Sequence, residues 1–176
     1  LKAYATPVSE EWFAAAIAGP KARDYLAALA PELDVSNEGL PMMRLAETMI
    51  AGVPARVMRM SYSGELSFEI NVPADWGGHV WAHMISTGNS YGLTAYGTEA
   101  MGALRIEKGH VTHSEADGRT TPDDLGLGRM ASRKKDAIGV RALDFPALQE
   151  SGRKQLVGLV ADDPAAAFPQ GAQVTA

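Results

Sequence analysis

Apolar and polar residues alternate strictly over positions 66–72, which read Leu-Ser-Phe-Glu-Ile-Asn-Val. This period of two is typical of a β-strand with one face in the core and the other toward water. The pattern predicts that Phe68 and Ile70 point inward and that Glu69 lies mid-strand on the polar face. A sheet with one buried face needs a covering layer, so this segment restricts the fold more than any other.

A second periodic segment occupies residues 98–109 and reads Thr-Glu-Ala-Met-Gly-Ala-Leu-Arg-Ile-Glu-Lys-Gly. Ala100, Met101 and Leu104 recur at helical spacing, and Thr98 is the predicted N-cap. Arg105 then follows after nearly two helical turns. A carboxylate on a strand and a guanidinium on a helix define a polar site when both elements are rigid.

The remaining patterns before this helix predict an α+β fold with a mainly antiparallel sheet. Helices and strands come in separate runs, which favours helices packed on one sheet over a parallel βαβ arrangement. Gly19-Pro20 separates the first two helices, because a proline is tolerated at the first position of a helix and not inside one. The predicted elements are helices at 9–18 and 20–30, strands at 45–50, 55–61 and 66–72, and a helix at 75–86.

The pattern weakens after Gly109. Residues 110–136 are rich in turn formers and charge, so we expect an extended loop there. Residues 139–148 are expected to form a short helix and residues 153–161 a strand that ends before Pro164.

Composition narrows the function classes. The chain has 176 residues, 46% of them hydrophobic, which suits one domain or one domain with part of a second. The net charge of -5 and the scattered basic residues argue against a nucleic-acid partner. The absence of cysteine removes disulfides and thiolate metal sites, and no apolar run has the roughly 20 residues that span a membrane. His79 and His83 lie four apart without a third ligand, so no metal site is predicted.

Three residues stand out as candidates for binding, each with an ordinary alternative. Glu69 offers two acceptor oxygens to paired donors, but a glutamate on the solvent face of a strand is the commoner case. Arg105 offers donors to a ring or an acidic group, or else pairs on the surface with a nearby glutamate. Tyr62 either stacks on a ligand or packs with its hydroxyl satisfied. The residues alone leave these alternatives open.

Five motifs follow one another between about Asn37 and Val160: S-Y-S-G-E-L-S-F-E, L-R-I-E-K-G, T-P-D-D-L-G-L-G, K-K-D-A-I-G and R-K-Q-L-V-G-L. In this order they resemble the folate-binding aminomethyltransferase family, typified by the T-protein of the glycine cleavage system. The fuller wordings S-G-E-L-S-F-E-I-N-V-P-A-D and Y-G-T-E-A-M are similar to the C-terminal part of the alpha subunits of heterotetrameric sarcosine oxidases. Aminomethyltransferases usually carry an Arg-Asp pair where this chain has Met101 and Gly102. That departure shifts the resemblance toward the oxidases.

The resemblance implies a fold and a site. Residues 1–150 are expected to form the folate-binding domain without its N-terminal part, and residues 151–176 to begin a small C-terminal β-barrel. Tyr62, Glu69 and Arg105 match positions at which the family binds folate. No catalytic residue is assigned, because the family's carboxylate near the reactive folate nitrogen is expected upstream of Leu1.

The resemblance also implies a function. A sarcosine oxidase of this type demethylates sarcosine oxidatively to glycine with release of hydrogen peroxide, and tetrahydrofolate captures the one-carbon unit as 5,10-methylenetetrahydrofolate. FAD, FMN and NAD are expected elsewhere in the complex, the beta, gamma and delta subunits are the expected partners, and the cytoplasm is the expected location. Two alternatives stay open: an aminomethyltransferase of the glycine cleavage system, and a folate-fold assembly module without catalysis.

Overall fold

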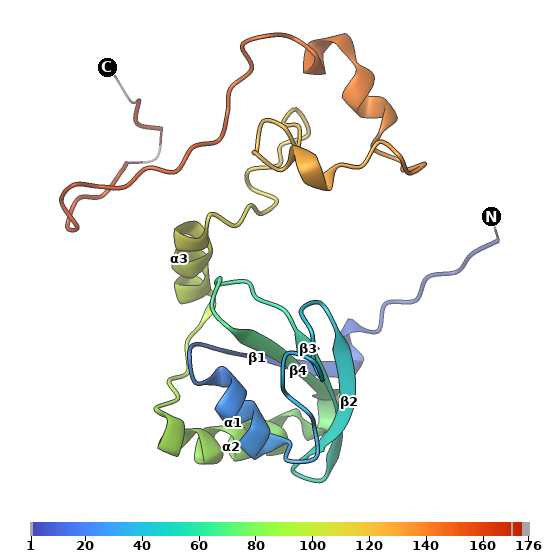
Figure 1. Cartoon of the computed structure of the whole chain (residues 1–176), viewed down its shortest axis with the longest axis vertical. Helices are drawn as coiled ribbons and strands as arrows, with labels where there is room; N and C mark the ends of the chain where they lie inside the picture. The colour runs from blue at the N-terminus through green and yellow to red at the C-terminus, as the bar shows by residue number, and fades with distance from the viewer. Residues whose placement is uncertain (1, 170, 174–176) are drawn as a thin grey trace. The chain divides into compact units, whose positions relative to one another are not determined.

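The computed structural model describes residues 2–169 and 171–173. The chain divides into two compact units, Leu1–His110 and Val111–Ala176, and each is described by itself. Figure 1 shows the helices and strands of the first unit and the irregular path of the second.

The first unit contains a four-stranded antiparallel sheet. The strand order is β1-β4-β3-β2, so β4 and β3 are inner strands and β1 and β2 are the edges among the described residues. The strands are β1 (Trp12–Ala18), β2 (Leu45–Ile50), β3 (Val53–Arg59) and β4 (Ser67–Pro73). The antiparallel sheet with its helices confirms the predicted α+β class.

From Phe68 onward the alternation that predicted β4 matches its burial, whereas Ser67, on the predicted polar face, is buried. Phe68, Ile70 and Val72 are completely buried, while Glu69 and Asn71 are half-buried on the opposite face. Two helices supply the apolar layer against the buried face, α1 (Ala22–Leu29) and α2 (Gly77–Gly88) (Figure 1). These helices correspond to the predictions at 20–30 and 75–86.

One hydrogen bond joins the two covering helices. The buried hydroxyl of Tyr25 on α1 donates to the main-chain oxygen of Met84 on α2 over 2.6 Å. Burial raises the pKa of Tyr25 to about 12. The hydroxyl therefore remains a hydrogen-bond donor throughout the physiological range.

The helix predicted from Ser9 is wrong. Ser9–Glu11 form a single 3-10 turn, and the chain then continues as strand β1. Phe13, Ala15 and Ile17 also satisfy a period of two, so this short apolar segment fits either type of element. Pairing with β4, which sets Ile17 opposite Phe68, decides the outcome in favour of the strand.

The helix predicted at the end of the first unit is α3 (Thr98–Lys108). Gly97 is its N-cap, with no side-chain capping bond, so the prediction of Thr98 as N-cap is wrong. The helix ends at Gly109, whose φ of 74° is a left-handed conformation that glycine adopts without strain. No residue of α3 is buried.

The second unit consists of turns and short 3-10 helices, as the sequence predicts for residues 110–136. The predicted short helix at 139–148 takes the form of two 3-10 turns, Arg141–Asp144 and Pro146–Leu148. Residues 153–161 have no strand partner among the described residues, so the strand predicted there is not formed in this structure. The β-barrel expected from residue 151 onward stays a prediction.

Candidate functional site

Tyr62 and Arg105 come together through His110. The rings of Tyr62 and His110 meet edge to face, with centroids 5.0 Å apart and planes at 63°. Arg105 donates from Nη1 to the main-chain oxygen of His110 over 3.3 Å. Two of the three predicted site residues are thus neighbours of one histidine.

The way in which α3 ends explains why His110 lies beside Tyr62 and Arg105. Its N–H donates to the oxygen of Arg105 over 2.8 Å, and the N–H of Gly109 donates to the oxygen of Ile106 over 2.9 Å. This pair of bonds is the Schellman motif, which closes a helix when the next residue is left-handed. The chain turns back at Gly109 and places His110 over the last turn of its own helix.

The loop that carries Tyr62 packs against the same helix end. Ser61 accepts a hydrogen bond from the N–H of Gly64 over 2.9 Å, and Gly64 has a φ of 90°. A Cβ at position 64 would lie 2.5 Å from Cδ of Lys108, so the lysine side chain crosses the space that any other residue would fill. Glycine at position 64 permits both the turn and the close approach.

Glu69 lies on the inner strand β4, between Ala16 of β1 and Met58 of β3. It is half-buried, and its Oε1 accepts a hydrogen bond from Nδ2 of Asn71 over 3.0 Å. Within the described part of the chain, Oε2 has no hydrogen-bonding partner. One carboxylate oxygen is therefore available to a donor outside the protein.

The three predicted residues do not form one connected cluster in this structure. Tyr62 and Arg105 share His110, whereas no hydrogen bond or ion pair among the described residues links Glu69 to either. The sequence reasoning missed His110, because a loop histidine without a partner motif carries no signal of its own. The signal that was available is Gly109, since a glycine that closes a helix returns the following residue to the last turn.

Two cations and the carboxylate of Glu107 lie in the last turn of α3, so its net charge is positive. Arg105 and Lys108 lie three apart, in the last turn of α3. Cations at a helix C-terminus are stabilised by the partial negative charge of the unpaired carbonyls there. The surface formed by Tyr62, His110, Arg105 and Lys108 is called the helix-end site below, and it suits a flat ring with an acidic group.

An apolar cavity of about 510 Å³ lies along β1 and α2. Its lining includes Phe13, Tyr25, Trp81 and Tyr96 but none of the predicted site residues. The cavity and the helix-end site are therefore separate features of the first unit.

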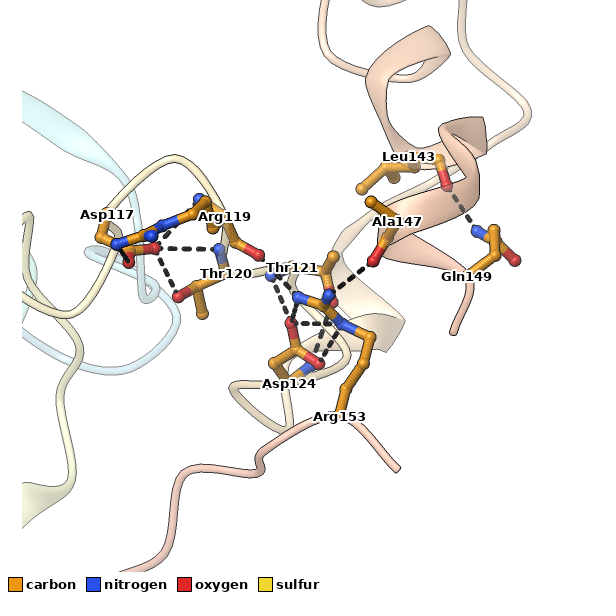
Figure 2. Close-up of polar contacts among 9 residues, drawn as sticks. All are labelled: Asp117, Arg119, Thr120, Thr121, Asp124, Leu143, Ala147, Gln149 and Arg153. Carbon is orange, nitrogen blue, oxygen red and sulfur yellow. Dashed lines mark hydrogen bonds and ion pairs between the residues drawn. The ribbon is translucent and has the colours of Figure 1, made fainter. Parts of the chain in front are cut away.

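The second unit has its own polar cluster, centred on Asp124 (Figure 2). The guanidinium of Arg153 donates to both oxygens of this carboxylate, over 2.6 Å from Nη2 to Oδ2 and 3.0 Å from Nε to Oδ1. The N–H of Thr121 donates to Oδ2 over 2.7 Å. These hydrogen bonds, that of Arg153 foremost, hold the pKa of the Asp124 carboxyl well below its usual range.

Arg153 also binds two main-chain oxygens, those of Ala147 and Arg119, over 2.9 and 2.6 Å (Figure 2). Asp124 braces its loop through Thr121 and Arg153. Arg153, 29 residues away, was not identified as the partner, because nothing in the local pattern marks it.

A metal centre finds no support within residues 2–169 and 171–173. They contain no group of three or more His, Asp or Glu placed to hold a metal ion. His79 instead lies 3.1 Å from the main-chain oxygen of Ala51, through Nε2. None of the helices in this part of the chain is long and apolar enough to cross a membrane.

Comparison with known proteins assigns the chain to a family. Residues 2–135 match the GCVT N-terminal domain. The sarcosine oxidase alpha subunit of Rhizobium meliloti strain 1021 is 39% identical over 96% of this chain, which covers 17% of that subunit. The alpha subunit of Corynebacterium strain U-96 is 38% identical over 97% of this chain and 18% of its own length. The aminomethyltransferase of Streptomyces coelicolor is 34% identical over 84% of this chain and 40% of its own length.

Proposed function

The chain belongs to the family of the GCVT N-terminal domain, and we propose that it is the folate-binding part of a sarcosine oxidase alpha subunit. The observation that carries the proposal is the similarity to two such subunits over nearly the whole chain. The chain spans less than one fifth of the length of these relatives. The activity below is therefore that of the larger subunit and its complex.

In this proposal tetrahydrofolate binds at Tyr62, Glu69 and Arg105. Glu69 accepts hydrogen bonds from ring and amino N–H groups through the oxygen that Asn71 leaves unpaired. Arg105 provides a charged donor, and Tyr62 an aromatic face already supported by His110. The donor and acceptor types fit a pterin ring with an acidic tail.

The task of these residues is orientation. Sarcosine is demethylated oxidatively to glycine with release of hydrogen peroxide, and bound tetrahydrofolate supplies the amine nitrogens that capture the one-carbon unit as 5,10-methylenetetrahydrofolate. Residues that hold a flat ring in one position convert a bimolecular encounter into a local one. Glu69 lies on the inner strand β4, which is hydrogen-bonded to a strand on each side. This position holds its carboxylate more firmly than the exposed helix α3 holds Arg105.

The proposal places the other cofactors and partners outside this chain. FAD, FMN and NAD bind elsewhere in the complex, and the beta, gamma and delta subunits are the partners. The cytoplasm is the proposed location, and the lack of cysteine is consistent with its reducing conditions.

An aminomethyltransferase is the second candidate, favoured by the similarity to the Streptomyces coelicolor enzyme. The two candidates differ in the donor of the one-carbon unit. An aminomethyltransferase releases methylenetetrahydrofolate and ammonia from a lipoyl-bound aminomethyl group, whereas the oxidase requires sarcosine and oxygen. Incubation of the full-length protein with each donor distinguishes them.

Calorimetric titration of tetrahydrofolate into the full-length protein tests the binding site. Glu69→Ala and Arg105→Ala should each weaken binding by about 1.5 to 3 kcal/mol, the usual cost of losing a charge-assisted hydrogen bond. Glu47→Ala is the matched control, because Glu47 is an exposed glutamate of the same sheet, paired with Arg56 on the surface. The affinity of the Glu47→Ala variant for tetrahydrofolate should equal that of the wild type.

The outcomes of this titration distinguish the assignment of the site residues from the proposal that the protein binds folate. Binding by the wild type that neither variant weakens would contradict the assignment of Glu69 and Arg105. An absence of binding by the wild type would contradict the folate proposal and favour an assembly module with this fold.

A further inference from the structure

We infer that His110 is a positioning residue of the folate site, which holds Tyr62 with its ring and Arg105 with its main chain. The inference rests on the proposed function, because it concerns the same ligand. It goes beyond that function by giving a role to a residue that neither the motifs nor the family match single out.

The ring of His110 supports the ring of Tyr62. This side chain is 38% exposed, so the protein core does not fix its ring. The His110 ring lies 5.0 Å away at 63°, within the range in which edge-to-face aromatic pairs attract. His110, which is itself exposed, therefore adds one aromatic contact to a ring that is only partly packed.

The main chain of His110 supports Arg105 through two hydrogen bonds. Its guanidinium donates to the oxygen of His110 over 3.3 Å, and its own main-chain oxygen accepts from the N–H of His110 over 2.8 Å. Both bonds involve main-chain atoms of His110, so they hold for any residue at this position that keeps the turn at Gly109. The identity of the side chain at position 110 therefore affects the contact with Tyr62 and not these two hydrogen bonds.

The contact of His110 with Tyr62 affects ligand binding because it joins two elements of the proposed site. Tyr62 lies in the loop after β3 and Arg105 lies on α3, so these two ligand contacts come from different elements. The contact between Tyr62 and His110 favours one arrangement of these elements before the ligand arrives. A site whose parts are already oriented loses less conformational freedom on binding.

The test is titration of tetrahydrofolate into full-length variants at position 110. His110→Ala should raise Kd about threefold to tenfold, the range expected for the loss of one aromatic pair. His110→Phe should restore Kd to within about twofold of the wild type, because phenylalanine keeps the edge-to-face contact. His113→Ala, at an exposed histidine three positions further along, should leave Kd unchanged.

A double-variant cycle links the effect to Tyr62. In a Tyr62→Leu background, His110→Ala should cause no further loss of affinity, since its partner ring is already absent. The NMR signals of the Tyr62 ring should shift in His110→Ala and stay near their original positions in His110→Phe.

Each outcome decides between the claims. Wild-type binding with an unchanged Kd in His110→Ala would overturn this inference and leave the proposed function in place. Equal losses in His110→Ala and His110→Phe would also overturn it, since the imidazole itself would then contact the ligand. An absence of binding by the wild type would overturn the proposed function, and the folate role of His110 with it.

Discussion

The two units of this chain are stabilised by different interactions. All buried apolar side chains of the described residues lie between Ile17 and Met84, in the first unit. The buried residues of the second unit are Thr121 and Asp124, both polar. The first unit thus has an apolar core, and the second has a hydrogen-bonded cluster in its place.

This difference determines how each unit responds to change. Apolar burial is non-directional and spread over many side chains, so it withstands changes of pH. The cluster at Asp124 depends on one carboxylate and one guanidinium in a fixed geometry. Removal of either partner breaks every hydrogen bond between the two side chains.

Phe68→Ala should produce the largest loss of stability. Phe68 is completely buried on the inner strand β4, and the substitution leaves a cavity at the centre of the sheet. Such changes cost about 3 to 5 kcal/mol. Urea unfolding followed by far-ultraviolet circular dichroism measures the loss. Leu45→Ala, at a half-exposed position on the edge strand β2, is the control and should cost much less. Equal losses in the two variants would show that the apolar core is not centred on β4.

Acid should affect the second unit before the first. The pKa of Asp124 is depressed in the folded chain, so its stabilising effect is complete above the unfolded value of 3.8 and is lost as the pH falls toward the folded value. The amide signal of Thr121, which donates to Asp124, should therefore change on acidification while that of Ile70 persists. NMR spectra recorded from pH 6 downward follow both.

Asp124→Asn is the matched control for this titration. The amide keeps the shape of the side chain but cannot ionise, so the Thr121 signal should no longer depend on Asp124 protonation. Loss of the Ile70 signal at the same pH as the Thr121 signal would contradict the contrast between the units.

Tyr25→Phe should cost about 1 kcal/mol, the smallest of these effects. The substitution keeps the ring in the core and removes only the hydrogen bond to the oxygen of Met84. Tyr91→Phe is the control, because Tyr91 packs against the Tyr25 ring at 5.4 Å and its hydroxyl makes no hydrogen bond among the described residues. Urea midpoints of the two variants provide the comparison. Equal midpoints would mean that apolar packing alone holds α1 to α2.

Local patterns predicted the elements whose period is unambiguous. Strand β4 follows from the alternation around Phe68, and α3 follows from the spacing of Met101 and Leu104. Strand β1 was mistaken for a helix, because Phe13, Ala16 and Ile17 satisfy helical spacing and only the pairing with β4 decides. Periodicity describes one segment at a time, so it fails where a distant partner determines the structure.

The candidate site shows the same limit. Glu69 and Arg105 were predicted as site residues from their match to the family's folate-binding positions, since their spacing alone left an ordinary surface role open. His110 and Arg153 were missed because their roles arise from contacts, with Tyr62 in one case and with Asp124 in the other. The contact between Arg153 and Asp124 spans 29 positions, beyond the reach of any turn motif.

Helix α3 carries Arg105, yet none of its side chains is buried. A segment that buries so little opens at a small cost in free energy, so a fraction of the molecules lacks the closed helix at any moment. The apparent Kd of a ligand that needs the closed helix equals the intrinsic Kd divided by the closed fraction. Gly102→Ala lies inside α3, where the added Cβ meets nothing within 4 Å, and alanine favours helix over glycine by about 1 kcal/mol. If the proposed folate site needs the closed helix, Gly102→Ala should therefore raise its affinity by increasing the closed fraction.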